Sequence, residues 1–136
     1  MTNHENKLSE MIAAALVDGI TVEIAPKLGT RDGWDIGAKH YQFTIRKGAN
    51  SYSGDYSQGS GIKRSPTGAD ILAALICDAS CYCSVRGIVE FAAEYGYHDS
   101  KTAQRAFNGC KEASANLRRI IGSRKVSDMI NAENDF

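Results

Sequence analysis

The chain has 136 residues and no net charge, because 16 Lys and Arg residues balance 16 Asp and Glu residues. This length suits one compact domain, residues 1–136, that folds without disulfides or metals. The balance argues against an acidic mimic of nucleic acid and gives no overall attraction to nucleic acid. The charges are segregated, however, since 67–99 has five acidic residues and one basic, and 100–125 has seven basic and one acidic. Such a layout suits docking on a charged partner.

The sequence shows no feature of a secreted or membrane protein. The N-terminal stretch MTNHENKLSEM is polar and mixed in charge, unlike a signal peptide. The longest apolar run, 71–77, is too short to cross a bilayer. We therefore expect a cytoplasmic protein with no membrane partner, whose four cysteines are free thiols.

The first 60 residues predict a helix followed by a sheet. Apolar side chains recur at helical spacing in 5–17, and the Asp-Gly pair that follows ends that helix. Alternating patterns predict strands at 20–25, 34–46 and 50–57. Short turns between the last two strands favour an antiparallel, three-stranded meander.

The rest of the chain, 65–131, predicts three to four helices. Ser65 is the expected N-cap and Pro66 the first residue of a helix that the SCYCS segment (80–84) breaks. Further expected features are a short helix over 85–95 that ends at Gly96, a long helix over 101–121 capped by Asp99 or Ser100, one or two helical turns in 124–131, and a frayed tail at 132–136. Strands followed by helices indicate the α+β class.

The stretch GSGIKRSPTGAD (59–70) raises the question of a phosphate-binding loop. A Walker A loop requires Gly-Lys-Ser/Thr where this chain has Ser60-Gly61, and the G-x-G-x-x-G fingerprint also fails. Lys63 and Arg64 beside a helix N-terminus are the remaining argument for an anion site. The alternative, which we favour, is a glycine-rich corner between strand and helix with solvated cations.

No other pattern predicts catalysis, a metal or a cofactor. Cys77, Cys81 and Cys83 lack the paired spacing of zinc ligands, and Cys77 and Cys110 fall on apolar helix faces as small hydrophobes. His98-Asp99 reads as a loop and helix cap, because no G-x-S-x-G nucleophile elbow accompanies it. We expect a protein that is not an enzyme and holds no cofactor.

The long helix carries a row of basic residues that is the main candidate for a binding surface. Lys101, Arg105 and Arg119 share one solvent face with Glu112, and Lys111 and Arg118 lie beside it. The row has three interpretations: an ordinary solvated face, a phosphate-contacting surface, or a surface that docks on an acidic protein. No aromatic residue lies on this face to stack on bases, and no helix-turn-helix spacing precedes it.

The string of motifs resembles a family of small proteins encoded by phages, prophages and other mobile elements. The resemblance covers about 34–122 and rests on WDIGAKHYQFTI, YSGDYSQGSG, SPTGADILAALICDAS, GIVEFAAEYGYHDSKTAQRAFNGC and EASANLRRIIG. The N-terminal helix and SCYCS lie outside the match. The family has no established activity, but small phage proteins without catalytic motifs are often inhibitors of host defence, anti-CRISPR proteins among them.

The resemblance implies a non-enzymatic inhibitor that occupies a surface of a bacterial defence complex, a Cas protein or a Cas–RNA complex. The alternative is a small nucleic-acid-binding accessory protein that uses the basic face of 101–121. The predicted contact residues of the inhibitor are Lys63, Arg64, Lys101, Arg105, Lys111, Arg118 and Arg119, and the alternative uses those of them that lie in 101–121.

Overall fold

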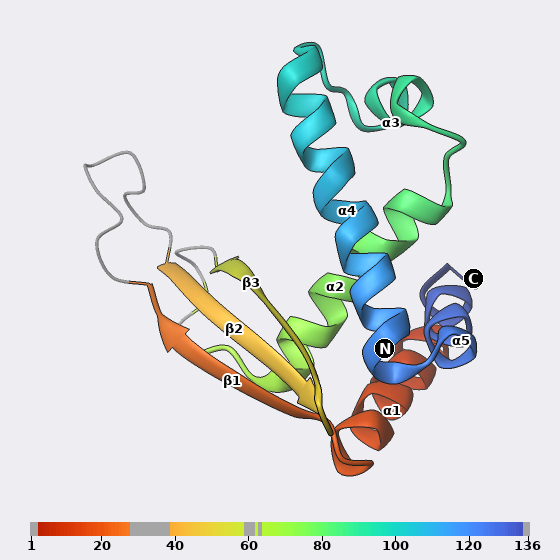
Figure 1. Cartoon of the computed structure of the whole chain (residues 1–136). Coiled ribbons are helices and arrows are strands. Elements are labelled where there is room, and N and C mark those ends of the chain that lie inside the picture. Colours follow the sequence, from red (N-terminus) through yellow and green to blue (C-terminus); the bar gives the residue numbers. More distant parts are fainter. Residues whose placement is uncertain (1–2, 28–38, 59–61, 63, 135–136) are drawn as a thin grey trace.

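The computed structural model describes residues 3–27, 39–58, 62 and 64–134, which form an N-terminal helix, a three-stranded antiparallel sheet and four further helices. The predicted α+β class is confirmed (Figure 1). The elements in chain order are α1 (Asn3–Val17), β1 (Thr21–Pro26), β2 (Lys39–Lys47), β3 (Asn50–Gln58), α2 (Gly68–Cys83), α3 (Ile88–Tyr95), α4 (Ser100–Ile121) and α5 (Ser123–Asn134).

The sheet has the strand order β1-β2-β3, with one face on the core and one polar face. Phe43 lies opposite Ile24 on β1 and Gly54 on β3, so these residues share the inner face. A Cβ atom at Gly54 would lie 2.8 Å from the Phe43 ring, so only glycine fits there without a shift. On the outer face, the hydroxyls of Thr44 and Ser53 lie 2.9 Å apart. The predicted start of β2, 34–38, lies outside the described residues.

The start and the end of α2 differ from the sequence prediction. The N-cap is Thr67 and not Ser65, because Thr67 and Asp70 form a reciprocal capping box in which each side chain accepts from the other residue's backbone N–H. Pro66 therefore precedes the helix. The SCYCS segment does not break the helix, which continues to Cys83. Tyr82 stays helical because its ring packs on Phe107 of α4, with ring centroids 5.4 Å apart.

The predicted end of α3 and the predicted N-cap of α4 are confirmed, because each depends on residues that are neighbours in the sequence. Gly96 ends α3 with a φ of 76°, in the left-handed region that glycine enters without strain. Asp99 caps α4, and its carboxylate accepts a hydrogen bond from the Thr102 backbone N–H at 2.8 Å. α3 itself begins later than predicted, at Ile88 after Gly87.

The C-terminal segment is a helix of three turns, longer than predicted. The tail that we expected to fray from residue 132 stays helical to Asn134. Ala132 is buried, and the Asn134 amide donates a hydrogen bond to the Ser80 hydroxyl of α2 at 2.9 Å. These contacts hold the end of α5 on α2.

The main hydrophobic core lies where the sheet, α1, α2, α4 and α5 meet (Figure 1). α3 lies apart from it, beside the N-terminal half of α4, and joins a second, aromatic cluster: the Phe91 ring is 5.2 Å from Phe107 and 5.6 Å from Tyr97. No single helix in the described ranges is both long and apolar enough to cross a membrane, and only α2 with α3, bent by 119°, passes that test as a pair.

We expect Thr67→Ala to lower the free energy of unfolding by about 1 kcal/mol, the usual cost of losing an N-cap hydroxyl. Ser65→Ala is the matched control, because the Ser65 side chain is exposed and forms no hydrogen bond with another described residue. Urea unfolding followed by circular dichroism measures both. A larger loss for Ser65→Ala than for Thr67→Ala would contradict the assigned cap.

Candidate functional site

The structure divides the predicted basic row of α4 into two groups. Lys101, Arg105 and Lys111, which we call the outer basic face, are exposed, and none of their side chains forms a hydrogen bond or ion pair with another described residue. Arg118 and Arg119, nearer the C-terminal end of α4, bind neighbouring elements instead. The seven predicted contact residues therefore do not form one free surface.

Arg118 connects three helices through its guanidinium. Its Nη1 donates to the Oγ atoms of Ser123 and Ser127, each at 2.9 Å, and to the Ser123 carbonyl. Its Nε donates to Ser114 Oγ at 3.3 Å, and its Nη2 lies 3.7 Å from Cys83 Sγ at the end of α2. The five contacts span α2, α4 and α5, so the residue is a structural hub.

Arg119 ties α4 to the sheet. Its Nη2 donates to the Ser51 carbonyl at 2.7 Å and to Asn116 Oδ1 at 2.9 Å, and its Nη1 to Asn50 Oδ1 at 3.4 Å. Ser51 and Asn50 open strand β3. A charge reversal at Arg119 would therefore remove contacts inside the fold as well as a surface charge.

Arg64 binds an acidic side chain at the start of α2, whereas Lys63 lies outside the described residues. The Arg64 guanidinium binds both oxygens of Asp70, with Nη2 2.9 Å from Oδ1. The Arg64 hydrogen bond, with those from Thr67, lowers the pKa of Asp70 to about 2 despite partial burial. The Asp70 carboxylate thus accepts a hydrogen bond from the backbone N–H of Thr67 at the N-terminus of α2. A negative charge held there disfavours a phosphate and supports the interpretation of 59–70 as a corner between strand and helix.

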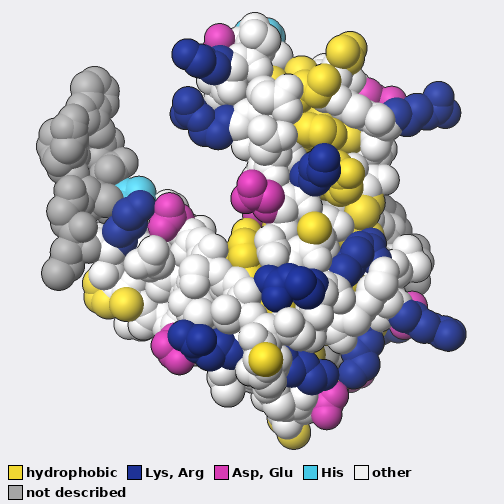
Figure 2. All heavy atoms as spheres, viewed as in Figure 1, with side chains coloured by type: hydrophobic (Ala, Val, Ile, Leu, Met, Phe, Trp, Pro, Cys, Tyr) yellow, Lys and Arg dark blue, Asp and Glu magenta, His cyan; other side chains and the backbone are white. Residues whose placement is uncertain are grey.

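Few acidic residues lie near the outer basic face. Asp99 caps α4, and hydrogen bonds from Thr102, assisted by the charge of Arg105, lower its pKa. Glu112 is exposed on the same side of the helix. Figure 2 shows Lys and Arg side chains spaced along the α4 arm, and apolar side chains between α4 and α3. The face is therefore cationic and open to a partner.

The four cysteines are free thiols, as predicted, but their placement differs in part. Cys77 is exposed and not on a buried apolar face, although partial burial of its thiol raises its pKa to about 11. Cys110 is half-buried, and burial raises its pKa to about 12. Both thiols are protonated at neutral pH, whereas nucleophiles and metal ligands are thiolates. Within the described ranges, no three His, Cys, Asp or Glu side chains converge to hold a metal ion.

One signal for the Arg118 hub was present in the sequence. Ser114 lies four residues before Arg118, which is the helical spacing for side-chain contact. Its other partners, Ser123, Ser127 and Cys83, lie beyond the ends of α4, and their positions depend on how α2 and α5 pack.

Comparison of the chain with protein-family models, with curated proteins and with solved structures gave no match. The case for the outer basic face as a binding surface therefore rests on the geometry of this structure and not on a relative.

We expect Arg118→Lys to lower the free energy of unfolding by about 1–3 kcal/mol, because one ammonium replaces few of the charged hydrogen bonds of the guanidinium. Arg105→Lys, on the same helix but without partners, should stay within about 0.5 kcal/mol of the wild type. Chemical denaturation of both variants makes the comparison. Equal stability of the two would contradict the structural role of Arg118.

The Asp70 pair predicts a specific acid response. Because the folded-state pKa of Asp70 is lowered from 3.8 to about 2, its stabilising contribution is present above pH 3.8 and is lost as the pH falls toward 2. Thermal melts of Asp70→Asn should show a weaker dependence on pH in this window than the wild type. Asp55→Asn, which breaks an exposed pair with Lys27, is the control. An unchanged slope in Asp70→Asn would exclude the pair as its source.

Proposed function

We propose that the chain is a non-enzymatic, phage-type inhibitor that binds a bacterial defence complex, a CRISPR–Cas effector, and blocks it by covering a surface. The observation that carries the proposal is the outer basic face, three cations on one helix that the described part of the fold leaves without partners. The inhibitor class comes from the resemblance of 34–122 to small phage proteins, and it places the protein in the host bacterial cytoplasm.

A rigid helix presents these cations. Lys101 and Lys111 are about 15 Å apart along α4, given the 1.5 Å rise per residue. The helix cannot shift easily, because Ala113, Leu117 and Ile120 are buried in the core and Arg118 and Arg119 hold its end. The helix backbone that carries these cations loses little conformational freedom on binding, and their charges steer an acidic surface into place.

The occupant we favour is an acidic protein surface, and bare nucleic acid is the alternative outcome. The exposed residues of α4 in the structure include no aromatic side chain on which bases could stack. Glu112 within the face also weakens attraction to a phosphate backbone. A Cas protein, with or without its guide RNA, offers the protein surface that this face fits.

We expect the triple variant Lys101→Glu, Arg105→Glu, Lys111→Glu to lose the partner and remain folded, since none of the three side chains forms a hydrogen bond or ion pair with another described residue. The matched control reverses Lys7, Arg86 and Arg124, which are also exposed and without a contact to another described side chain, and so makes the same change in net charge. Both are used as bait in a nuclease-treated lysate with active CRISPR–Cas, and bound proteins are identified by mass spectrometry.

A Cas protein recovered by the wild type and the control, but not by the triple variant, supports the proposal. Recovery of DNA or RNA alone, lost after nuclease treatment and weakened steeply by salt, replaces it with the nucleic-acid function. A Cas protein bound equally by all three forms would exclude the outer basic face as the contact.

A further inference from the structure

A second candidate site lies between α1 and α5, away from the outer basic face. The cavity has a volume of 310 Å³ and is lined by Met11, Ala14, Ala15, Asp18, Lys125, Asp128 and Met129. That volume is equivalent to about ten water molecules and falls at the lower end of the range for small-molecule pockets. The two helices bring together residues that are more than a hundred positions apart in the sequence.

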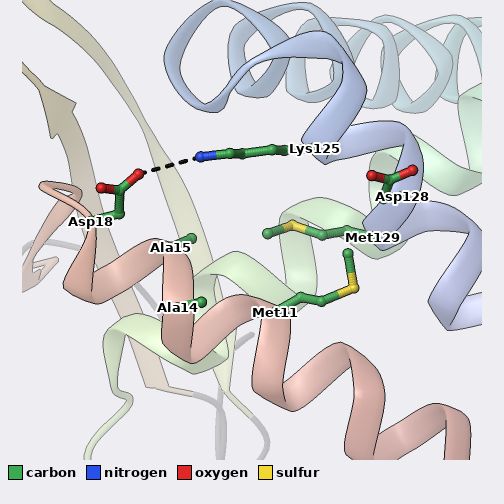
Figure 3. A pocket seen from close by; sticks show the side chains of 7 residues that line it. All are labelled: Met11, Ala14, Ala15, Asp18, Lys125, Asp128 and Met129. Atoms are coloured by element: carbon green, nitrogen blue, oxygen red, sulfur yellow. Dashed lines mark hydrogen bonds and ion pairs between the residues drawn. The ribbon is translucent and has the colours of Figure 1, made fainter.

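The walls of this cavity are apolar and adjustable. Figure 3 shows the Met129 side chain extending from α5 over α1, the Met11 side chain ending close to it, and Ala14 and Ala15 beside them on α1. Alanine leaves the space open, and the flexible thioether chains can adapt to the shape of a guest. An apolar group inside would replace water on these walls, which is favourable.

The rim of the cavity is charged, and one of its charges is unmatched. The Lys125 ammonium reaches across to Asp18 at 3.3 Å, and Lys47 reaches the same carboxylate at 3.7 Å. Hydrogen bonding and the positive charge of Lys125 lower the pKa of Asp18, with Lys47 adding to the effect. Asp128, one turn after Lys125 on α5, forms no ion pair with any described residue (Figure 3). The carboxylate left at the rim selects for a positive charge.

We propose that this cavity binds a small apolar molecule that carries one ammonium group, an alkyl- or arylammonium compound. The apolar part lies between Met11 and Met129, and the ammonium lies at the rim beside Asp128. The Lys125 ammonium at the rim is paired with Asp18 and is therefore not a free cation for an anionic ligand. The site is separate from the proposed contact with a defence complex and does not depend on it.

Two methionines provide a direct test, because Met11 and Met129 both line the cavity. Protein labelled with carbon-13 at the methionine methyl groups is titrated with phenethylamine and, separately, with the neutral phenethyl alcohol. We expect saturable shifts of the Met11 and Met129 signals and a Kd for the amine about threefold lower than for the alcohol, as one exposed ion pair allows.

Variants separate the charge from the cavity. Asp128→Asn should raise the Kd for phenethylamine about threefold and leave the alcohol unchanged. Ala14→Leu should abolish binding of both probes by filling the cavity, whereas Ala13→Leu, exposed on the same helix but not lining the cavity, should bind both normally. Circular dichroism confirms that each variant is folded.

Three results would overturn the proposal. These are no saturable shift with phenethylamine, equal affinity for the amine and the alcohol with no effect of Asp128→Asn, and binding that survives Ala14→Leu.

Discussion

Burial of α2 is the constraint on which the rest of the structure depends. Its Ile71, Leu72 and Ile76 have no exposed surface, and α1, α4, α5 and β1 all pack against it. Each such side chain contributes about 1.5–3 kcal/mol on burial, so the helix that supplies more of them than any other element determines where its neighbours lie. The sheet covers one side of this assembly through Phe43 and Ile45 (Figure 1).

This arrangement makes α4 a helix with two different halves. Its C-terminal half is held in the core by Leu117 and Ile120 and by the contacts of Arg118 and Arg119. Its N-terminal half extends beyond the sheet and carries α3 through the Phe91–Phe107 contact (Figure 1). Lys101 and Arg105 of the outer basic face lie on the N-terminal half and Lys111 lies at the middle of the helix, all three exposed, so a partner can approach them without disturbing the core.

About half of the cations with described side chains form hydrogen bonds or ion pairs within the fold. Lys27 pairs with Asp55, Arg46 with Glu23 and Arg64 with Asp70. Asp18 receives both Lys47 and Lys125, which brings α1, β2 and α5 together at one point. The chain has no net charge, but its charges are paired unevenly: many form local ion pairs, and the cations of the outer basic face on α4 do not. The same folding leaves Asp128 free beside an apolar cavity.

The sequence by itself determined the features that depend on neighbouring residues. The α+β order, α1, the start of α4 at Asp99 and the left-handed end of α3 at Gly96 all follow from periodicity and capping within a few positions. The Thr67 cap could also have been found this way, since Asp70 follows it at capping-box spacing.

Tertiary structure decided the rest, because those features join residues far apart in the chain. SCYCS stays helical because Tyr82 packs on Phe107, and the C-terminal turn is ordered because Asn134 reaches Ser80. Spacing on a helix shows which arginines face outward but not that Arg119 meets Ser51, 68 positions away. The cavity likewise exists only where α1 meets α5, since neither Met11 nor Met129 has a pattern that predicts the other.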